Sequence, residues 1–171
     1  MDGPEPWWQT HPFPVDEDEG VCGLWTYLCR QGSRGTVEIA GTDPAQAPVI
    51  DLGLLSDTGD VDKFADAWEA NRALLASAPF ARHNARWIEP AGAIRDHVPA
   101  TIGTAHHQSG TCRMGRDPAT SVVGPDLKVH GIDGLMVADA SAFPDTIMHN
   151  LNLTAYLFGE AAAQTIAGEA A

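Results

Sequence analysis

The chain has 171 residues, 44% of them apolar, which is enough for one ordinary domain with a core and too few to expect two independent domains. Its 23 acidic and 10 basic residues give a net charge of −13, which disfavours nucleic acid and anionic membranes as partners. No apolar run reaches the roughly 18 residues of a membrane span, and the acidic, proline-containing N-terminus lacks the pattern of a secretion signal. We therefore expect a cytoplasmic protein.

The first half of the chain predicts a small antiparallel sheet with a covering helix. Residues 1–20 combine acids, prolines and tryptophans, which is typical of an extended and partly docked segment. The β-rich runs 21–30 and 35–41 flank a Gly-Ser turn and predict an antiparallel pair, and 49–55 predicts a further short strand. Apolar residues at helical spacing then predict a helix over 61–78.

The second half predicts fewer regular elements. Two short apolar strands are expected at 127–131 and 134–141, around a Gly-Ile-Asp-Gly turn. A last helix begins near Asn150 or Asn152, either of which can cap it, and runs to about Ala167. Its N-terminus is expected to point at a histidine-rich stretch that precedes it.

The three cysteines, Cys22, Cys29 and Cys112, form no CxxC pair, and their odd number fits a reducing compartment better than a disulfide framework. The pair His106–His107 together with Cys112 superficially resembles a set of metal ligands. Adjacent residues on an extended chain point to opposite faces, however, and no carboxylate completes a site at standard spacing. We therefore predict no metal site.

The stretch from His106 to Asn152 holds four of the seven histidines among glycines. Taken alone, His107 could be a structural histidine satisfied by its own contacts. Its neighbour Gly110 lets the backbone bend closely around a ligand, and the helix that begins near Asn150 concentrates positive partial charge at its start. A neutral histidine with an amide and a helix N-terminus opposite is suited to removing a proton from an alcohol.

The ordered motifs of this stretch resemble the C-terminal region of the glucose-methanol-choline (GMC) flavoprotein oxidoreductases. They are HQSGTCRMG at 107–115, two valines at 122–123, LKVHG at 127–131, GLMVADAS at 134–141, Pro144, and NLN at 150–152. Upstream, the run SRGTV at 33–37, the Asp43-Pro44 loop, PVID at 48–51 and Asp60 are also similar to the family. The resemblance covers roughly residues 20–168.

The resemblance implies catalytic roles for two residues. His107 falls on the family's histidine before Gly-Thr, which serves as the base for the substrate hydroxyl proton. Asn150 falls where the family has a second His or Asn that holds the substrate oxygen. Hydride would pass from the alcohol carbon to N5 of FAD. His130 and His149 match no clear family role and are expected to be packing or surface residues.

The resemblance also implies contacts with FAD. Asp139 and Ala140 match a turn against its ribityl and phosphate portion, and Leu151 and Asn152 match a helix start whose N–H groups face its pyrimidine carbonyl. His106 is a further candidate for a flavin-side contact. Two simpler interpretations stay open, in which Asp139 caps a turn and Asn152 caps the helix without either residue contacting FAD.

The fold class that follows is α/β (α+β), the C-terminal part of a GMC oxidoreductase. A substrate-side antiparallel sheet with a covering helix is followed by a strand and a helix that return to the FAD-side domain. We expect an extended segment at 1–20, a substrate-domain portion at 21–115 and a portion that completes the FAD domain at 116–171.

One family feature is missing from this sequence, which has no GxGxxG after a first strand to bind the ADP half of FAD. We therefore expect a split enzyme that oxidises an alcohol or sugar hydroxyl, in which a second polypeptide supplies the Rossmann-like FAD domain. The alternative is a non-catalytic remnant or a binding subunit that keeps the fold without bound FAD.

Overall fold

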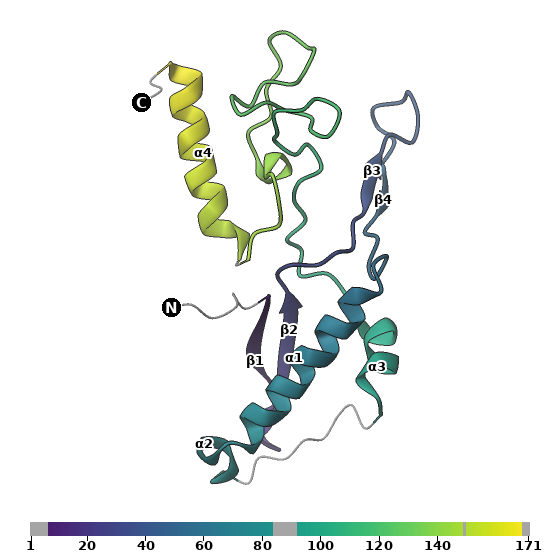
Figure 1. The fold of residues 1–171 in the computed structure, drawn as a ribbon, viewed down its shortest axis with the longest axis vertical. Helices are drawn as coiled ribbons and strands as arrows, with labels where there is room; N and C mark the ends of the chain where they lie inside the picture. Colours follow the sequence, from purple (N-terminus) through teal and green to yellow (C-terminus); the bar gives the residue numbers. More distant parts are fainter. Residues whose placement is uncertain (1–6, 84–91, 149, 169–171) are drawn as a thin grey trace. The chain divides into compact units, whose positions relative to one another are not determined.

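The computed structural model describes residues 7–83, 92–148 and 150–168. The chain divides into two compact units, Met1–Gly103 and Thr104–Ala171 (Figure 1). The mixture of helices with antiparallel strand pairs confirms the predicted α/β (α+β) class. The sequence-based division near Gly115 concerns the domains of a whole enzyme and stays a prediction.

The first unit begins with an antiparallel hairpin. Strand β1 (Trp8–Asp16) pairs with β2 (Val21–Leu28), so that Trp8 lies opposite Leu28. An acidic turn joins the two strands and ends at Gly20, whose φ of +67° lies in the left-handed region that glycine adopts without strain. The segment predicted to be extended at the N-terminus therefore supplies a full strand.

The predicted pairing of 21–30 with 35–41 is wrong. Strand β2 pairs with β1, whereas β3 (Thr36–Glu38) pairs with β4 (Val49–Asp51) in a separate two-stranded sheet. The Gly-Ser turn at 32–33 does not close a hairpin because its backbone N–H groups donate to the carboxylate of Asp60 instead. That contact directs the chain away from β2 before β3 begins.

The predicted helix over 61–78 is confirmed as α1 (Gly59–Ala76). A short helix, α2 (Ala78–Ala81), follows it, and α3 (Ile94–Thr101) lies against α1. Helix α1 also lies against β2, where Asn71 Nδ2 donates to Thr26 Oγ1 at 3.0 Å. One face of the hairpin is thereby covered.

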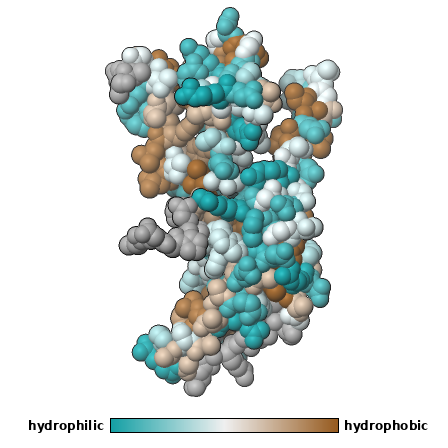
Figure 2. Space-filling view, in the orientation of Figure 1, coloured by the Kyte–Doolittle hydropathy of each residue, from teal (hydrophilic) through white to brown (hydrophobic). Residues whose placement is uncertain are grey.

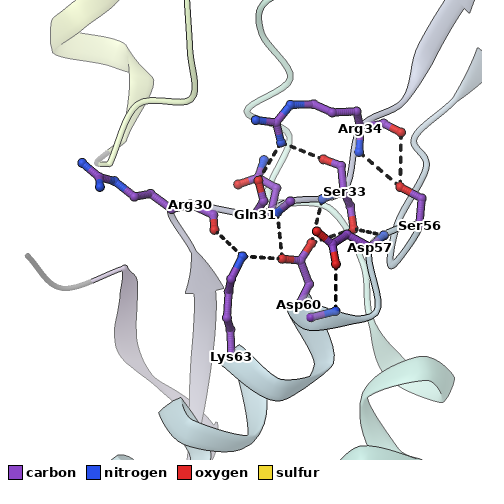
Figure 3. A network of polar contacts seen from close by, with 10 residues as sticks. Arg30, Gln31, Ser33, Arg34, Ser56, Asp57, Asp60 and Lys63 are labelled. Atoms are coloured by element: carbon purple, nitrogen blue, oxygen red, sulfur yellow. Dashed lines mark hydrogen bonds and ion pairs between the residues drawn. The ribbon is translucent and has the colours of Figure 1, made fainter.

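A polar network joins the start of α1 to the loop between β2 and β3 (Figure 3). The carboxylate of Asp60 is only 2% exposed and accepts hydrogen bonds from the backbone N–H groups of Gly32 and Ser33, at 2.8 and 2.9 Å. The Ser33 hydroxyl donates to it at 2.6 Å and Lys63 Nζ at 2.8 Å. A buried charge with this many donors fixes the loop on the helix.

The second unit is mostly irregular. Its regular elements are a short 3-10 helix, η1 (Ala140–Ala142), and helix α4 (Leu151–Ala167). The strands predicted at 127–131 and 134–141 are reduced to isolated antiparallel bridges, one between Lys128 and Met136 and one between Val129 and Val123. They stop short because Gly131 and Gly134 turn the chain with positive φ and η1 begins directly after Asp139.

The core of the second unit is small. Val123, Ala142 and Phe143 are almost fully buried, and the Phe143 ring meets Phe158 of α4 edge-on at a centroid distance of 5.2 Å. Through this contact α4 packs on the segment that carries η1. None of the helices in the described ranges combines the length and apolarity that a membrane crossing requires.

Candidate active site

The loop before Gly110 carries the predicted base. The Thr104 hydroxyl accepts from the backbone N–H of His106 at 3.0 Å and from Gln108 Nε2 at 2.6 Å, which closes a tight turn. His106 adopts φ of +59°, a left-handed conformation that is uncommon for a residue with a Cβ. His107, in the middle of this turn, is exposed, so its imidazole is open to a ligand.

Three backbone hydrogen bonds hold the next residues against the Asp139 turn. The N–H groups of Gly110, Cys112 and Met114 donate to the carbonyl groups of η1, residues 140–142, at 2.8–3.0 Å. The segments are about thirty residues apart in sequence, and this ladder brings the His107 loop next to the predicted flavin-contact turn. Gly110 has φ of +79°, and a Cβ there would lie 3.4 Å from the carbonyl oxygen of Phe143.

Gly110→Ala is expected to destabilise the second unit by about 1–2 kcal/mol, because alanine is strained in the left-handed region. The measurement is thermal unfolding followed by circular dichroism. Gly103→Ala is the matched control, since a Cβ at Gly103 meets nothing within 4 Å and its backbone is not left-handed. Equal melting temperatures for the two variants would contradict the assigned role of Gly110.

Asp139 caps η1. Its Oδ1 accepts from the backbone N–H of Ser141 at 2.8 Å and from the Ser141 hydroxyl at 2.5 Å. The simpler interpretation, that Asp139 caps a turn, is therefore confirmed. Both Asp139 and the half-buried Ala140 remain accessible, and the cap leaves Oδ2 of Asp139 without a recorded partner in the described parts of the chain. The cap and the predicted flavin contact are compatible.

Asn150 caps α4. Its Oδ1 accepts from the backbone N–H of Asn152 at 3.2 Å, so the cap is Asn150, and the alternative of Asn152 as the cap is wrong. Because Oδ1 faces the helix, Nδ2 is the end of the amide that can donate to a ligand. The N–H groups of Leu151 and Leu153 belong to the first turn and have no intrahelical acceptor.

Asn150→Ala should lower the free energy of unfolding by about 1 kcal/mol, since it removes the acceptor for a first-turn N–H group. Asn150→Ser should keep most of that stability because serine also caps helices. Asn152→Ala serves as the control, as the exposed Asn152 side chain does not form the cap. Helix content at 222 nm during thermal unfolding is the readout, and identical curves for Asn150→Ala and Asn152→Ala would contradict the cap.

All seven residues predicted for the site lie in the second unit. The backbone ladder joins the His107 loop to Asp139 and Ala140, and the Phe143–Phe158 contact joins that turn to α4. No hydrogen bond between His107 and Asn150 is recorded within the ranges that the structure describes. Two residues that organise the site, Thr104 and Phe143, were missed from the sequence, because nothing local marks a hydroxyl or a ring as the anchor of a distant turn.

His130 has the packing role expected for it. Its Nε2 lies 3.2 Å from the carbonyl oxygen of Gly115 and 3.1 Å from Ser121 Oγ. A carbonyl can only accept, so Nε2 carries the proton and the ring clamps the loop between them. His149 lies outside the described residues.

A metal site finds no support in the described ranges, which contain no group of three or more His, Cys, Asp or Glu side chains placed to hold an ion. Cys22, Cys29 and Cys112 are free thiols. Burial raises the pKa of the Cys29 thiol, which makes it a poor nucleophile or ligand.

The chain is similar in sequence to a family of known enzymes. The family model described as GMC oxidoreductase matches residues 31–159. The chain is 36% identical over 140 residues to an alcohol dehydrogenase (acceptor) from Pseudomonas putida, covering 78% of this chain and 25% of that protein. It is likewise 36% identical over 148 residues to the oxygen-dependent choline dehydrogenase of Escherichia coli strain K12/DH10B, covering 83% of this chain and 26% of the relative.

A solved structure supports the same family relationship. An FAD-dependent oxidoreductase from Chaetomium thermophilum superimposes with a TM-score of 0.78 at 29% identity, covering 88% of this chain and 27% of that chain. The chain thus spans about a quarter of the length of the relatives that it matches.

Proposed function

Because the chain belongs to the GMC oxidoreductase family, we propose that it is the base-bearing part of a split FAD-dependent enzyme that oxidises an alcohol or sugar hydroxyl. The observation that carries the proposal is the placement of the family's histidine motif, residues 107–115. Backbone hydrogen bonds join this motif to the Asp139 turn, and the capped start of α4 lies in the same unit. The name of the Pseudomonas putida relative, an alcohol dehydrogenase, supports this reaction class.

The proposed chemistry assigns one task to each end of the site. The exposed imidazole of His107 takes the proton of the substrate hydroxyl, a step for which histidine is the side chain used most often. Nδ2 of Asn150 donates a hydrogen bond to the substrate oxygen as it becomes negative, while Oδ1 stays on the helix. The positive end of the α4 dipole favours the same charge.

The residues present fit FAD. The first turn of α4 offers N–H donors at Leu151 and Leu153 to a carbonyl or anionic group, and the N–H of Asn152 is already used by the cap. Oδ2 of Asp139, which has no hydrogen-bond partner among the described residues, can accept from ribityl hydroxyls, with Ala140 beside it and His106 as a further contact. When bound, FAD supplies the acceptor for the substrate's hydride.

A second polypeptide that carries the FAD domain completes the proposal. The sequence has no GxGxxG motif of its own to bind the ADP half of FAD. Figure 2 shows an apolar patch over α4, where Leu153, Tyr156 and Leu157 are 64–72% exposed. Large apolar side chains on one helix face are typical of a surface that another protein covers.

The deciding experiment is to purify the chain with its natural partners through an affinity tag and to record the visible spectrum. A yellow complex with flavin bands and a second subunit supports the split enzyme. A colourless, partner-free chain would contradict it and favour the non-catalytic remnant.

In the flavin-loaded complex, Asn150→Ser should slow substrate-dependent flavin reduction by about tenfold or more, although it keeps the helix cap. Serine cannot reproduce the Nδ2 donor, and a hydrogen bond to a charged oxygen contributes about 1.5–3 kcal/mol. Stopped-flow bleaching of the flavin band measures the rate. An unchanged rate with unchanged stability would leave Asn150 with the cap alone.

A further inference from the structure

The segment that carries His107, residues 104–109, has no regular secondary structure. Helix α3 ends before it, at Thr101, and the first backbone hydrogen bond after it joins the N–H of Gly110 to the carbonyl of Ala140 at 3.0 Å. Among the described residues, no backbone-to-backbone hydrogen bond involves residues 104–109. A contact other than a helix or sheet ladder must therefore set the direction of the His107 side chain.

The Thr104 hydroxyl supplies that contact. Its oxygen accepts from the backbone N–H of His106 at 3.0 Å and from Nε2 of Gln108 at 2.6 Å. A hydroxyl oxygen has two lone pairs, so both of its acceptor positions are in use. The two donor residues directly precede and follow His107, so one half-buried oxygen holds the chain on both sides of the proposed base.

The turn is held against a backbone preference. His106 has a φ of +59°, in the left-handed region. For a residue with a Cβ, that conformation is disfavoured by about tenfold relative to the ordinary right-handed one. The hydrogen bond from its N–H to Thr104 favours the turn by a factor of similar size. Because the two effects nearly balance, loss of the Thr104 acceptor allows His106 to leave the left-handed region.

A change of φ at His106 moves His107. Rotation about one backbone bond reorients the atoms that follow it as far as the next anchor, which is the N–H of Gly110. The exposed imidazole of His107 forms no hydrogen bond with the described residues that would hold it in place. A base acts only within hydrogen-bond reach of the proton that it takes, and a displacement of about 1 Å can slow a reaction by about a hundredfold.

We propose that Thr104 is a positioning residue for the base: its hydroxyl keeps the left-handed turn at His106 closed and thereby fixes the imidazole of His107 for the substrate hydroxyl. The inference rests on the proposed function for the role of His107. It requires no contact between Thr104 and substrate or flavin. Thr104 should therefore affect the rate only while His107 is present.

The first test is residue-resolved amide hydrogen exchange on the full chain. The His106 amide, bonded to Thr104, should be protected by about tenfold relative to the His107 amide, which has no acceptor among the described residues. Thr104→Val has a similar shape but no acceptor, so this protection should disappear. Thr104→Ser keeps the hydroxyl and should keep the protection. Equal protection of the two amides in the unaltered chain overturns the proposal without any variant.

The second test is stopped-flow flavin reduction in the flavin-loaded complex. Thr104→Val should lower the limiting rate by about tenfold or more and change the half-saturating substrate concentration by less than about twofold, because the base has moved and the binding surface has not. Thr104→Ser should restore most of the rate. Thr101→Val is the matched control, since the exposed Thr101 hydroxyl donates to the His97 carbonyl within α3, and its rate should be unchanged.

The His107→Ala background separates positioning from a general structural effect. There, Thr104→Val should slow the reaction by less than about twofold further, because no base remains to be positioned. Equal losses in both backgrounds overturn the proposal, as does an unchanged rate in Thr104→Val alone, and the split enzyme stands in either case. A rate unchanged by His107→Ala, or a colourless chain without a partner, overturns the base and its positioning together.

Circular dichroism checks that each variant folds. If Thr104→Val does not fold, the exchange of the His106 amide in the unaltered chain and in Thr104→Ser still decides the question.

Discussion

His107→Ala is expected to slow flavin reduction in the active complex by about a hundredfold or more, because a positioned base contributes about 10²–10⁴-fold to proton transfer. The imidazole is exposed on a turn closed by the Thr104 hydroxyl, and it forms no hydrogen bond or ion pair with the described residues. Stability should therefore change little while the rate falls. Stopped-flow reduction at saturating substrate, together with a melting curve, measures both quantities.

The rate of His107→Ala should depend on pH differently from that of the unaltered complex, because the group that takes the proton has been removed. His83→Ala is the control, since His83 is exposed in the first unit, where its ring accepts a hydrogen bond from Arg82 Nε. Reduction at the original rate in His107→Ala would remove this residue from the role of base. An equal loss in His83→Ala would point to a general effect on folding.

Asp60→Ala is expected to destabilise the first unit by about 3 kcal/mol or more, because it leaves two backbone N–H groups and the Ser33 hydroxyl without their buried acceptor and removes the ion-pair partner of Lys63. Urea unfolding followed by tryptophan fluorescence measures the loss. Glu69→Gln is the control, as Glu69 is an exposed acid of the same helix. Equal midpoints for the two variants would contradict the structural role of Asp60.

The same carboxylate gives stability a defined pH dependence. Burial alone would raise the pKa of Asp60, but hydrogen bonds from Lys63, Ser33 and Gly32 outweigh it and lower the pKa to about 2, from 3.8. A carboxyl whose pKa is lower in the folded state stabilises fully above its unfolded pKa. Its contribution of about 2 kcal/mol is lost as pH falls from about 4 towards 2. Asp60→Asn should flatten the stability profile in that window.

Much of the local structure could be predicted. The spacing of apolar residues in α1 and the asparagine before α4 are signals carried within a few residues of the element, and both helices are confirmed within two residues of their predicted starts. The family motif around His107 is also local, and it identified the family that the comparisons support. The sequence limited the cap of α4 to two candidates, Asn150 and Asn152. The hydrogen bond from the Asn152 N–H to Asn150 Oδ1 identifies Asn150 as the cap.

Strand pairing could not be predicted in the same way. The partner of β2 is β1 because the Gly-Ser turn that was expected to close a hairpin gives its N–H groups to Asp60, 27 and 28 residues further along. Nothing in the turn itself announces that acceptor. The same holds for Asn71, which reaches Thr26 across 45 residues.

The two long helices, the fold class and the family's histidine motif could therefore be predicted from the amino-acid sequence, since each depends on neighbouring residues. The backbone ladder between the His107 loop and the Asp139 turn, the buried position of Asp60 and the pairing of β2 with β1 became visible only in the folded structure. These depend on contacts between distant residues, whose hydrogen-bond partners are chosen by packing of the whole chain and leave no mark at either end.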